Sequence, residues 1–207
     1  MRILQLGKFY PVLGGVEKVM FDITSGLSET GVECDMMCAT SDGRGSEVIG
    51  LNPCGRVICC KTWMKKARTT IAPSMITDLR RRVNDYDIIH IHHPDPMAAV
   101  ALMLSGFKGK VVLHWHSDIL SQKTLLKFYL PIQNWLIKRA DAIVGTSPVY
   151  LAESPYLQKV QGKNRCIPIG IVPNRSDSAK VQGIRNEYAG RKIIFSLGRL
   201  VEYKGYR

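Results

Sequence analysis

Histidines, carboxylates and paired glycines gather at a few points of the chain where an apolar run ends. His116 and Asp118 close the sequence His-Trp-His-Ser-Asp, which follows the apolar run 110–114. A neutral imidazole can donate a hydrogen bond to a hydroxyl or a carbonyl, and a nearby carboxylate can orient it or bind an acceptor hydroxyl. His116 and Asp118 are therefore the candidate catalytic residues, whereas His114 is expected to be buried.

Gly14 and Gly15 open the first predicted helix. Glycine lets a ligand approach the backbone closely, and a helix N-terminus offers unpaired N–H groups and partial positive charge. This pair could therefore hold a diphosphate, although a simple tight turn would use the same residues. The dinucleotide fingerprint G-x-G-x-x-G does not follow the first apolar run.

A histidine-rich segment, His-Ile-His-His-Pro-Asp, begins at His90. Alternation along a strand puts His90 and His92 on one face, where they could resemble a metal pair. The spacing shows no third ligand, so no metal is expected. The alternative is that His92, His93 and Asp95 form a polar, hydrogen-bonded edge.

Near the end of the chain, Arg199 and Lys204 follow the apolar run 192–197. A guanidinium and an ammonium in one loop can clamp a diphosphate leaving group. A solvated, charged loop is the simpler reading of the same spacing.

A basic segment combines cations with an aromatic side chain, a mixture that suits an anionic membrane surface. Nucleic acid is the rival partner, but no RNP pattern, helix-turn-helix or zinc-finger spacing supports it, so no nucleic acid is expected. A solvated helix face remains a third possibility, because Arg80, Arg81 and Arg82 follow closely. The predicted membrane patch consists of Lys61, Trp63, Lys65, Lys66 and Arg68.

Composition limits the classes of protein that remain. The 207 residues are 45% hydrophobic and 22% charged, which excludes general disorder. No run of about 18 uncharged apolar residues occurs, so no transmembrane helix is expected. The first residues are typical of a strand and not of a secretory signal. The net charge of +12 favours an anionic partner.

The six cysteines include no C-x-x-C pair. We expect them to be small buried hydrophobic residues of a protein in a reducing compartment, and not zinc ligands.

Apolar runs typical of strands alternate with segments of helical periodicity. The strands are expected at 2–6, 32–39, 57–60, 87–92, 110–114, 142–146 and 166–168. This alternation predicts an α/β fold with a doubly wound parallel sheet of the Rossmann-like kind, whose ligands lie beyond the carboxyl ends of the strands. The most unusual residues follow the first, fourth and fifth of these runs.

The polar composition after residue 170 predicts a domain boundary. Residues 1–170 are expected to form a Rossmann-like domain, 171–190 a linker, and 191–207 the first strand and loop of a truncated second Rossmann-like domain. One strand and a loop cannot bury a core alone.

Six segments, in this order, resemble the N-terminal half of a GT-B glycosyltransferase of the retaining family 4, nearest to mannosyltransferase-like enzymes of O-antigen or exopolysaccharide assembly. The segments are Gly14–Val19, Asp87–Pro94, His114–Asp118, Arg139–Pro148, Ile167–Ile171 and Gly198–Gly205.

The resemblance implies two Rossmann-like domains, a nucleoside-diphosphate sugar as donor, and no metal or other cofactor. Gly15 matches the glycine loop near the donor phosphates, and His116 matches the histidine that contacts the transferred sugar. Arg199 and Lys204 match the pair that holds the diphosphate. Fixed cations would stabilise charge that develops on the leaving group. His92, His93 and Asp95 fall on the acceptor side.

Two departures from the family pattern bear on activity. Family members continue past Arg207 with the rest of the second domain, including an acidic E-x7-E motif, and Ile169-Gly170 stands where Asn-Gly is common. We therefore expect weak donor binding and little or no transfer by these 207 residues alone.

The resemblance implies transfer of a hexose, most simply mannose, to a glycan or lipid-linked acceptor with retention, in surface polysaccharide biosynthesis. The expected location is cytoplasmic, peripheral at the inner face of the plasma membrane. The alternatives are a non-catalytic module that binds phosphate or lipid, and a nucleotide-dependent oxidoreductase, which the missing fingerprint disfavours.

Overall fold

The fold is built around a mainly parallel sheet. The computed structural model describes all residues except 42, 44, 67–68, 120–122, 172–175 and 199–207. Within the described residues, eight strands pair in the order β10-β9-β8-β7-β1-β2-β4-β3, and only β3 runs antiparallel to its neighbour. This arrangement confirms the predicted α/β fold class.

The strands of this sheet are β1 (Arg2–Tyr10), β2 (Glu33–Thr40), β3 (Glu47–Asn52), β4 (Gly55–Cys60), β7 (Ile88–His93), β8 (Lys110–Trp115), β9 (Ala142–Gly145) and β10 (Asn164–Cys166). The order reverses direction between β1 and β7, because the chain adds β2 and β4 on one side of β1 and β7 to β10 on the other. Such a switch point is where doubly wound sheets bind their ligands.

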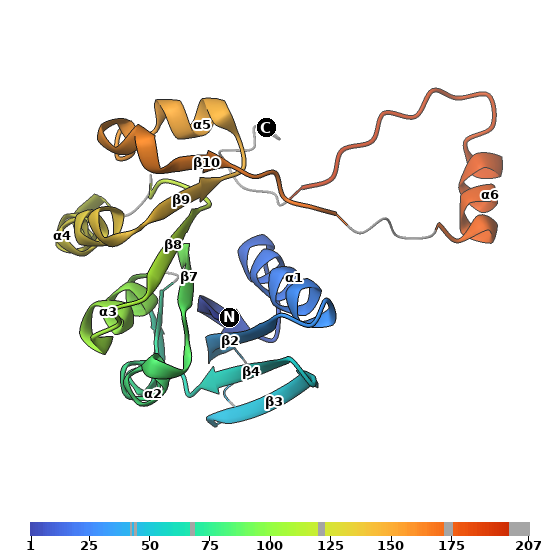
Figure 1. Ribbon diagram of the computed structural model, residues 1–207. Coiled ribbons are helices and arrows are strands. Elements are labelled where there is room, and N and C mark those ends of the chain that lie inside the picture. Colours follow the sequence, from blue (N-terminus) through green and yellow to red (C-terminus); the bar gives the residue numbers. More distant parts are fainter. Residues whose placement is uncertain (42, 44, 67–68, 120–122, 172–175, 199–207) are drawn as a thin grey trace. The chain divides into compact units, whose positions relative to one another are not determined.

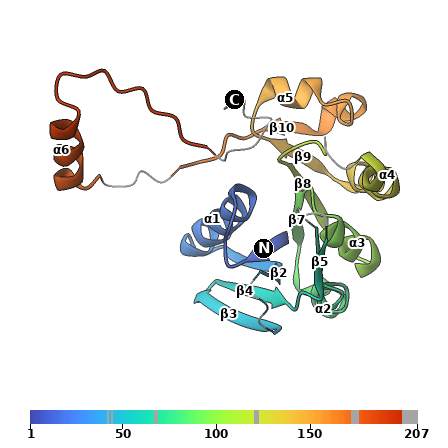
Figure 2. The same ribbon diagram turned by 180° about the vertical axis from the view of Figure 1, so that it is seen from behind.

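Helices cover both faces of the sheet. Figures 1 and 2 show α1 against one face and α2, α3 and α4 against the other. The helices are α1 (Gly15–Glu29), α2 (Ser74–Arg82), α3 (Pro96–Ser105), α4 (Lys123–Arg139), α5 (Pro148–Glu153) and α6 (Ser178–Glu187), with short 3-10 turns at Val83–Asp85 and Gln158–Lys163.

Alternation along the strands divides the buried side chains between the two faces. Leu4 and Leu6 of β1 join the larger core under α2, α3 and α4. On the α1 face, Met20 of that helix packs against Met36 and Cys38 of β2. Gln5 lies between Leu4 and Leu6 in sequence and therefore points to the α1 side.

Three local features differ from the sequence-based expectations. The first strand was expected to end at residue 6, but β1 continues to Tyr10 with a bulge between Leu6 and Phe9. Gly7 and Lys8 take positive φ angles of 130° and 56° in this bulge. Strand β3 was not expected, and the last strand is Asn164–Cys166 instead of 166–168.

The basic segment forms a separate hairpin of β5 (Met64–Lys66) and β6 (Thr69–Ile71). No strand was expected from the sequence between residues 61 and 86. Since each strand has three residues, the pattern is too short to stand out from a loop.

The described chain divides into two units, Met1–Ile169 and Gly170–Arg207. In the second unit, helix α6 lies within the segment expected to be a linker, and Asp177 caps it through the backbone N–H groups of Ala179 and Lys180. Residues 192–197 form no strand in the structure, and Ile194 is 98% exposed. A strand needs a neighbour for its backbone hydrogen bonds, so the assignment of 191–207 to a second domain stays a prediction.

Four of the six cysteines, Cys34, Cys38, Cys59 and Cys60, are buried as expected. Cys54 is only half-buried and Cys166 is exposed, because Cys166 ends the edge strand β10. Among the described residues, no helix combines the length and apolarity needed to cross a bilayer.

Candidate functional site

The residues singled out by the sequence follow three neighbouring strands. Gly14 and Gly15 come after β1, Asp95 after β7, and His116 after β8, and the sheet order places β8, β7 and β1 side by side. These strands are parallel, so their carboxyl ends meet at one edge. The structure thus brings these residues to the same edge, at the switch point of the sheet.

Helix α1 begins directly beyond this edge. Gly14 is its N-cap residue and supplies no side-chain cap, and both glycines are exposed. A Cβ added at Gly15 would meet open space, whereas one added at Gly14 would collide with Oε2 of Glu17. The carboxylate of Glu17 is the flexible end of a side chain and can move aside for a Cβ at Gly14, while the open space at Gly15 leaves the helix N-terminus accessible to a ligand.

Asp95 organises the edge itself. One oxygen of its carboxylate accepts a hydrogen bond from the backbone N–H of Ala98 at 3.0 Å, which caps α3. The other accepts from the backbone N–H of Lys8 in the β1 bulge, and Lys8 Nζ also donates to the carbonyl of Pro94. Asp95 therefore joins β1 to the start of α3, a structural role that differs from the acceptor contact expected for it.

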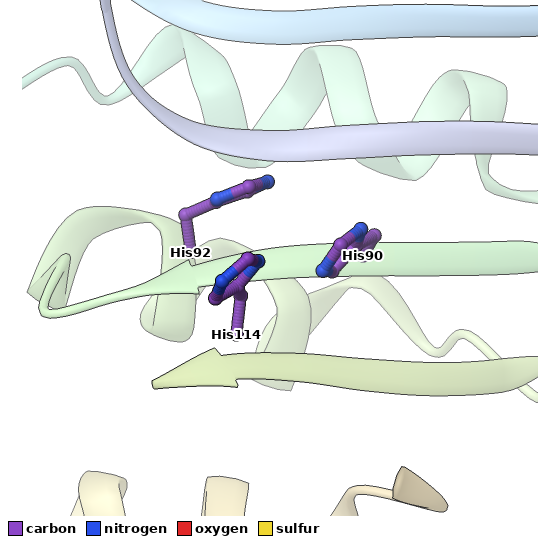
Figure 3. Close-up of side chains that lie close together, drawn as sticks. All are labelled: His90, His92 and His114. Atoms are coloured by element: carbon purple, nitrogen blue, oxygen red, sulfur yellow. The ribbon is translucent and has the colours of Figure 1, made fainter. Parts of the chain in front are cut away.

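Three histidines share the α1 face of the sheet. Figure 3 shows His90 and His92 on β7 and His114 on β8, with ring nitrogens that lie within 4.8 Å of one another. His92 and His114 are direct neighbours in the strand register. Spacing along the sequence indicates the pair on β7 but not His114, because His114 lies on another strand.

The orientation of these rings does not suit a shared metal ion. Their planes lie within 30° of parallel, with centroids 4.7–5.3 Å apart. A Zn–N bond of about 2.0 Å would place tetrahedral ligand nitrogens about 3.3 Å apart, with each lone pair aimed at the metal in the plane of its ring. Parallel, separated rings do not direct their lone pairs to one point. That the protein binds no metal stays a prediction.

His116 extends this cluster to the edge of the sheet. Its ring stacks on His114 at 4.0 Å between centroids, and its Nε2 lies 2.9 Å from Nδ1 of His92. Nε2 of His92 in turn lies 2.9 Å from Oε1 of Gln5. His116 is half-buried, while His92 and Gln5 are completely buried. His92 thus contacts His116, and its place on the acceptor side stays a prediction.

Burial keeps these histidines neutral. It lowers the pKa of His116 to about 2, with help from the neighbouring His114 and Lys8, and that of His90 to about 3. It lowers the pKa of His114 to about 4 and holds that of His92 well below 6.5. At neutral pH each ring therefore carries one N–H donor and one lone-pair acceptor.

His93 faces the other side of the sheet. It is 1% exposed, stacks on Trp115 at 3.8 Å, and bonds through Nε2 to Oε1 of Gln133 at 3.3 Å. Burial lowers its pKa to about 3. The expectation that His93 meets the acceptor is therefore wrong for this structure, because successive residues of a strand point to opposite faces.

Asp118 does not contact His116 in the structure. Its Oδ1 accepts hydrogen bonds from Nε1 of Trp115 at 2.8 Å and from Oγ of Ser154 at 2.9 Å. Its backbone N–H donates to the hydroxyl of Tyr150. The side chain that contacts His116 is His92, and Asp118 ties the loop after β8 to α5. A catalytic role for Asp118 stays a prediction.

Part of the predicted site lies outside the described residues. Arg199, Lys204 and Arg68 are in undescribed segments, so their predicted roles stay predictions. Lys65 and Lys66 lie on β5, and Lys61 precedes the hairpin and is exposed. Trp63 is 80% exposed beside them.

Gln5 was not among the residues expected at the site. Its signal in the sequence is an amide inside the apolar run 2–6, because a polar residue inside an apolar strand needs a partner. Gln133, the partner of His93, is completely buried as well.

Comparison with known proteins identifies the family of this chain. The model of Glycosyltransferase Family 4 matches residues 13–175. The O-antigen chain mannosyltransferase C of Escherichia coli is 32% identical over 99% of this chain and 56% of its own length. The D-rhamnosyltransferase WbpZ of Pseudomonas aeruginosa is 26% identical over 99% of this chain and 54% of its own. The chain thus spans about half the length of these relatives.

Solved structures share the fold. HepE from Anabaena, in complex with UDP and glucose, superimposes with a TM-score of 0.58 at 17% identity, over 91% of this chain and 50% of its own. Sucrose-phosphate synthase from Thermosynechococcus elongatus gives 0.56 at 18% identity, over 83% and 49%. The family model covers most of the chain, and the solved structures share its fold. These findings confirm the resemblance to family 4 glycosyltransferases: the chain belongs to Glycosyltransferase Family 4.

Proposed function

We propose that this chain forms one wall of the active site of a glycosyltransferase that moves a hexose, mannose first among them, from a nucleoside-diphosphate sugar to a lipid-linked glycan. The observation that supports this most is that Gly15 and His116 both follow strands that end at the switch-point edge of a Family 4 chain. The accessible N-terminus of α1 offers N–H groups and positive potential to the donor diphosphate.

The proposed step is transfer with retention. The bond between the anomeric carbon and the β-phosphate oxygen breaks, and its electron pair leaves with the diphosphate. The acceptor hydroxyl forms the new bond on the same face of the sugar and gives its proton to the departing phosphate oxygen. Fixed positive groups favour this step because negative charge grows on the diphosphate. We assign that charge stabilisation to the N-terminus of α1, Arg199 and Lys204.

The relatives bear on the substrates. Those with 32% and 26% identity are named for transfer of mannose and D-rhamnose, and HepE was solved with UDP-glucose. These names support a hexose or a deoxyhexose carried on a nucleotide, and the O-antigen name supports a role in surface polysaccharide synthesis. Mannose is our first choice because the more similar relative transfers it.

We further propose that the protein works peripherally at the inner, cytoplasmic face of the plasma membrane. Trp63 and Met64 are 80% and 52% exposed at the hairpin that carries Lys65 and Lys66. The exposed side chains of Lys61 and Trp63, next to Lys65 and Lys66 in the sequence, favour an anionic lipid surface. An open apolar pocket of about 290 Å³ lies beside the hairpin and is lined by Thr70, Ile71, Pro73, Ile76, Pro96, Met97 and Val100.

A transfer assay tests the proposed activity. The chain would be assayed alone and joined to the part of the E. coli relative that it does not match, which we call the combined protein. The donors would be sugar nucleotides that include GDP-mannose and UDP-glucose, and the acceptors would be lipid-linked glycans. We expect transfer only from the combined protein, and a loss of at least about 100-fold for His116→Ala. Donor binding without transfer by the combined protein would favour a non-catalytic binding module instead.

A further inference from the structure

A chain of hydrogen bonds runs from the core of the sheet to the proposed site. Oε1 of Gln5 lies 2.9 Å from Nε2 of His92, and Nδ1 of His92 lies 2.9 Å from Nε2 of His116. The amide nitrogen of Gln5 points the other way, toward Sγ of Cys34 at 3.8 Å. The chain crosses the switch point, because Gln5 belongs to β1 and His92 to β7.

The direction of each bond follows from donor and acceptor chemistry. A carbonyl oxygen only accepts, so Nε2 of His92 donates to Gln5. His92 is completely buried and neutral, so it has a single ring proton and its Nδ1 must accept. Nε2 of His116 therefore donates to His92, and the lone pair of His116 resides on Nδ1.

The remaining nitrogen of His116 is available to a ligand. Among the described residues, Nδ1 of His116 makes no hydrogen bond, and its side chain is half-buried at the carboxyl edge. The stack on His114, with planes 8° apart, restrains the ring orientation. An acceptor nitrogen is thus presented in a fixed direction.

We propose that Gln5 and His92 are positioning residues that hold His116 as its Nε2–H tautomer, so that Nδ1 accepts a hydrogen bond from a hydroxyl group of the bound sugar substrate. This reverses the polarity expected from the sequence, in which His116 donates. The identity of the ligand as a sugar rests on the proposed function, whereas the tautomer does not. A ligand with only an acceptor, such as an ether or fluorine, at that position binds poorly, because two lone pairs would face each other.

The tautomer can be measured without any substrate. All five histidines of the chain lie on or beside β7 and β8, so a spectrum of ¹⁵N-histidine-labelled protein reports on this region alone. Single His→Gln variants assign the resonances. At pH 7.5 we expect His92 and His116 to be protonated at Nε2. Protonation of His116 at Nδ1 would overturn the proposal.

Substitutions at Gln5 test whether this residue sets the tautomer of His116. In Gln5→Met the acceptor is lost, and we expect a substantial population of His116 protonated at Nδ1. In Gln5→Glu an acceptor returns, and we expect the Nε2–H form to be restored. Urea midpoints establish that each variant is folded. An unchanged His116 spectrum in folded Gln5→Met would contradict the proposal, and a Gln5→Met chain that does not fold leaves the wild-type tautomer as the deciding measurement.

Gln133 offers a matched control, because it is an equally buried glutamine bonded to a histidine on the other face of the sheet. Gln133→Met should change the His93 resonance and leave His116 as it is. An equal change at His116 would make the Gln5 effect non-specific and overturn the proposal. None of these measurements needs transfer activity. A failure of the proposed hydrogen-bond chain from Gln5 to His116 can therefore be distinguished from a failure of the proposed function.

Discussion

Nδ1 of His92 lies 2.9 Å from Nε2 of His116, and this contact joins the buried face of β7 to the loop that follows β8. A side chain at the edge of the sheet is thereby held by one that is completely buried. Rigid support of this kind is what a binding or catalytic group needs, because its orientation is set before the ligand arrives.

The buried histidines predict loss of stability in mild acid. Their folded-state pKa values are lowered to about 4 for His114, about 3 for His90 and His93, and about 2 for His116. Below pH 6.5 the unfolded chain binds protons that the folded chain does not, so the free energy of unfolding falls as the pH falls from 6.5 toward 4. Each histidine contributes up to about 1.4 kcal/mol per pH unit.

Urea unfolding between pH 7.5 and 5.0 measures this effect. His114→Gln, which removes one titrating group, should flatten the slope. A free energy of unfolding that does not change across this range would show that the histidines are accessible to protons in the folded chain.

Gly15→Ala separates folding from donor binding. A Cβ at this position meets no atom within 4 Å, so alanine should stabilise the chain by about 0.5–1 kcal/mol through the reduced entropy of the unfolded state. The same methyl group obstructs a diphosphate at the start of α1, and we expect donor affinity to fall at least roughly tenfold. Calorimetry with the donor and urea midpoints give both values.

Gly14→Ala is the companion variant. It should lower stability only slightly, because alanine is less favourable than glycine at an N-cap and its Cβ would shift only the flexible carboxylate of Glu17. If Gly15→Ala binds the donor as tightly as the wild type does, the N-terminus of α1 is not a phosphate site.

Asp95→Ala should destabilise the first unit by about 2 kcal/mol, because it removes the cap of α3 and the bond to the Lys8 N–H. Asp177→Ala is the matched control: it removes an N-cap from α6, a helix with no buried residues. We expect little change in the cooperative urea transition for that control. Equal urea midpoints for the two variants would show that the bonds of Asp95 to β1 and α3 do not stabilise the first unit.

Asp118→Asn distinguishes a structural role from the catalytic role predicted by the sequence. Asparagine keeps an oxygen for Trp115 and Ser154, so we expect the combined protein to keep transfer within about tenfold of wild type. Asp118→Ala leaves the Trp115 N–H without its partner and should cost about 2–3 kcal/mol of stability. A loss of transfer far beyond tenfold in a stable Asp118→Asn protein would restore the catalytic assignment.

Membrane association should depend on salt. We expect vesicles with anionic lipid to bind the chain at low ionic strength and to release it at high ionic strength, because screening weakens the attraction. Replacing Lys61, Lys65, Lys66 and Arg68 by serine should abolish binding in a flotation assay. A control with the same charge change replaces Lys108, Lys127, Lys138 and Lys159, and binding that depends only on net charge would be lost equally in both.

The sequence was sufficient for the architecture because strand and helix periodicity are local properties. The apolar runs at 2–6 and 110–114 correspond to β1 and β8. The hairpin β5–β6 was missed because its strands are short, and β3 was missed because its pairing with β4 is set by tertiary structure. The bulge at Gly7 depends on the Asp95 carboxylate, which arrives from a distant part of the chain.

The site was only partly predictable for the same reason. His116 and the two glycines were recognisable as residues at the carboxyl edge. The hydrogen-bonded side chains behind His116 were not recognisable. Gln5 and His92 lie on different strands and are 87 residues apart in the sequence, so only the fold brings them together. The opposite roles of His92 and His93 could have been inferred from alternation, which puts neighbouring strand residues on different faces.

We propose that a sugar nucleotide binds at the edge formed by the carboxyl ends of β8, β7 and β1, against His116. The most direct test is a titration of the combined, ¹⁵N-histidine-labelled protein with GDP-mannose and UDP-glucose. We expect a saturable shift of the His116 resonance with one of these donors, and no comparable shift of His93 on the opposite face. Saturable donor binding that leaves His116 unperturbed, or perturbs His93 alone, would contradict this proposal.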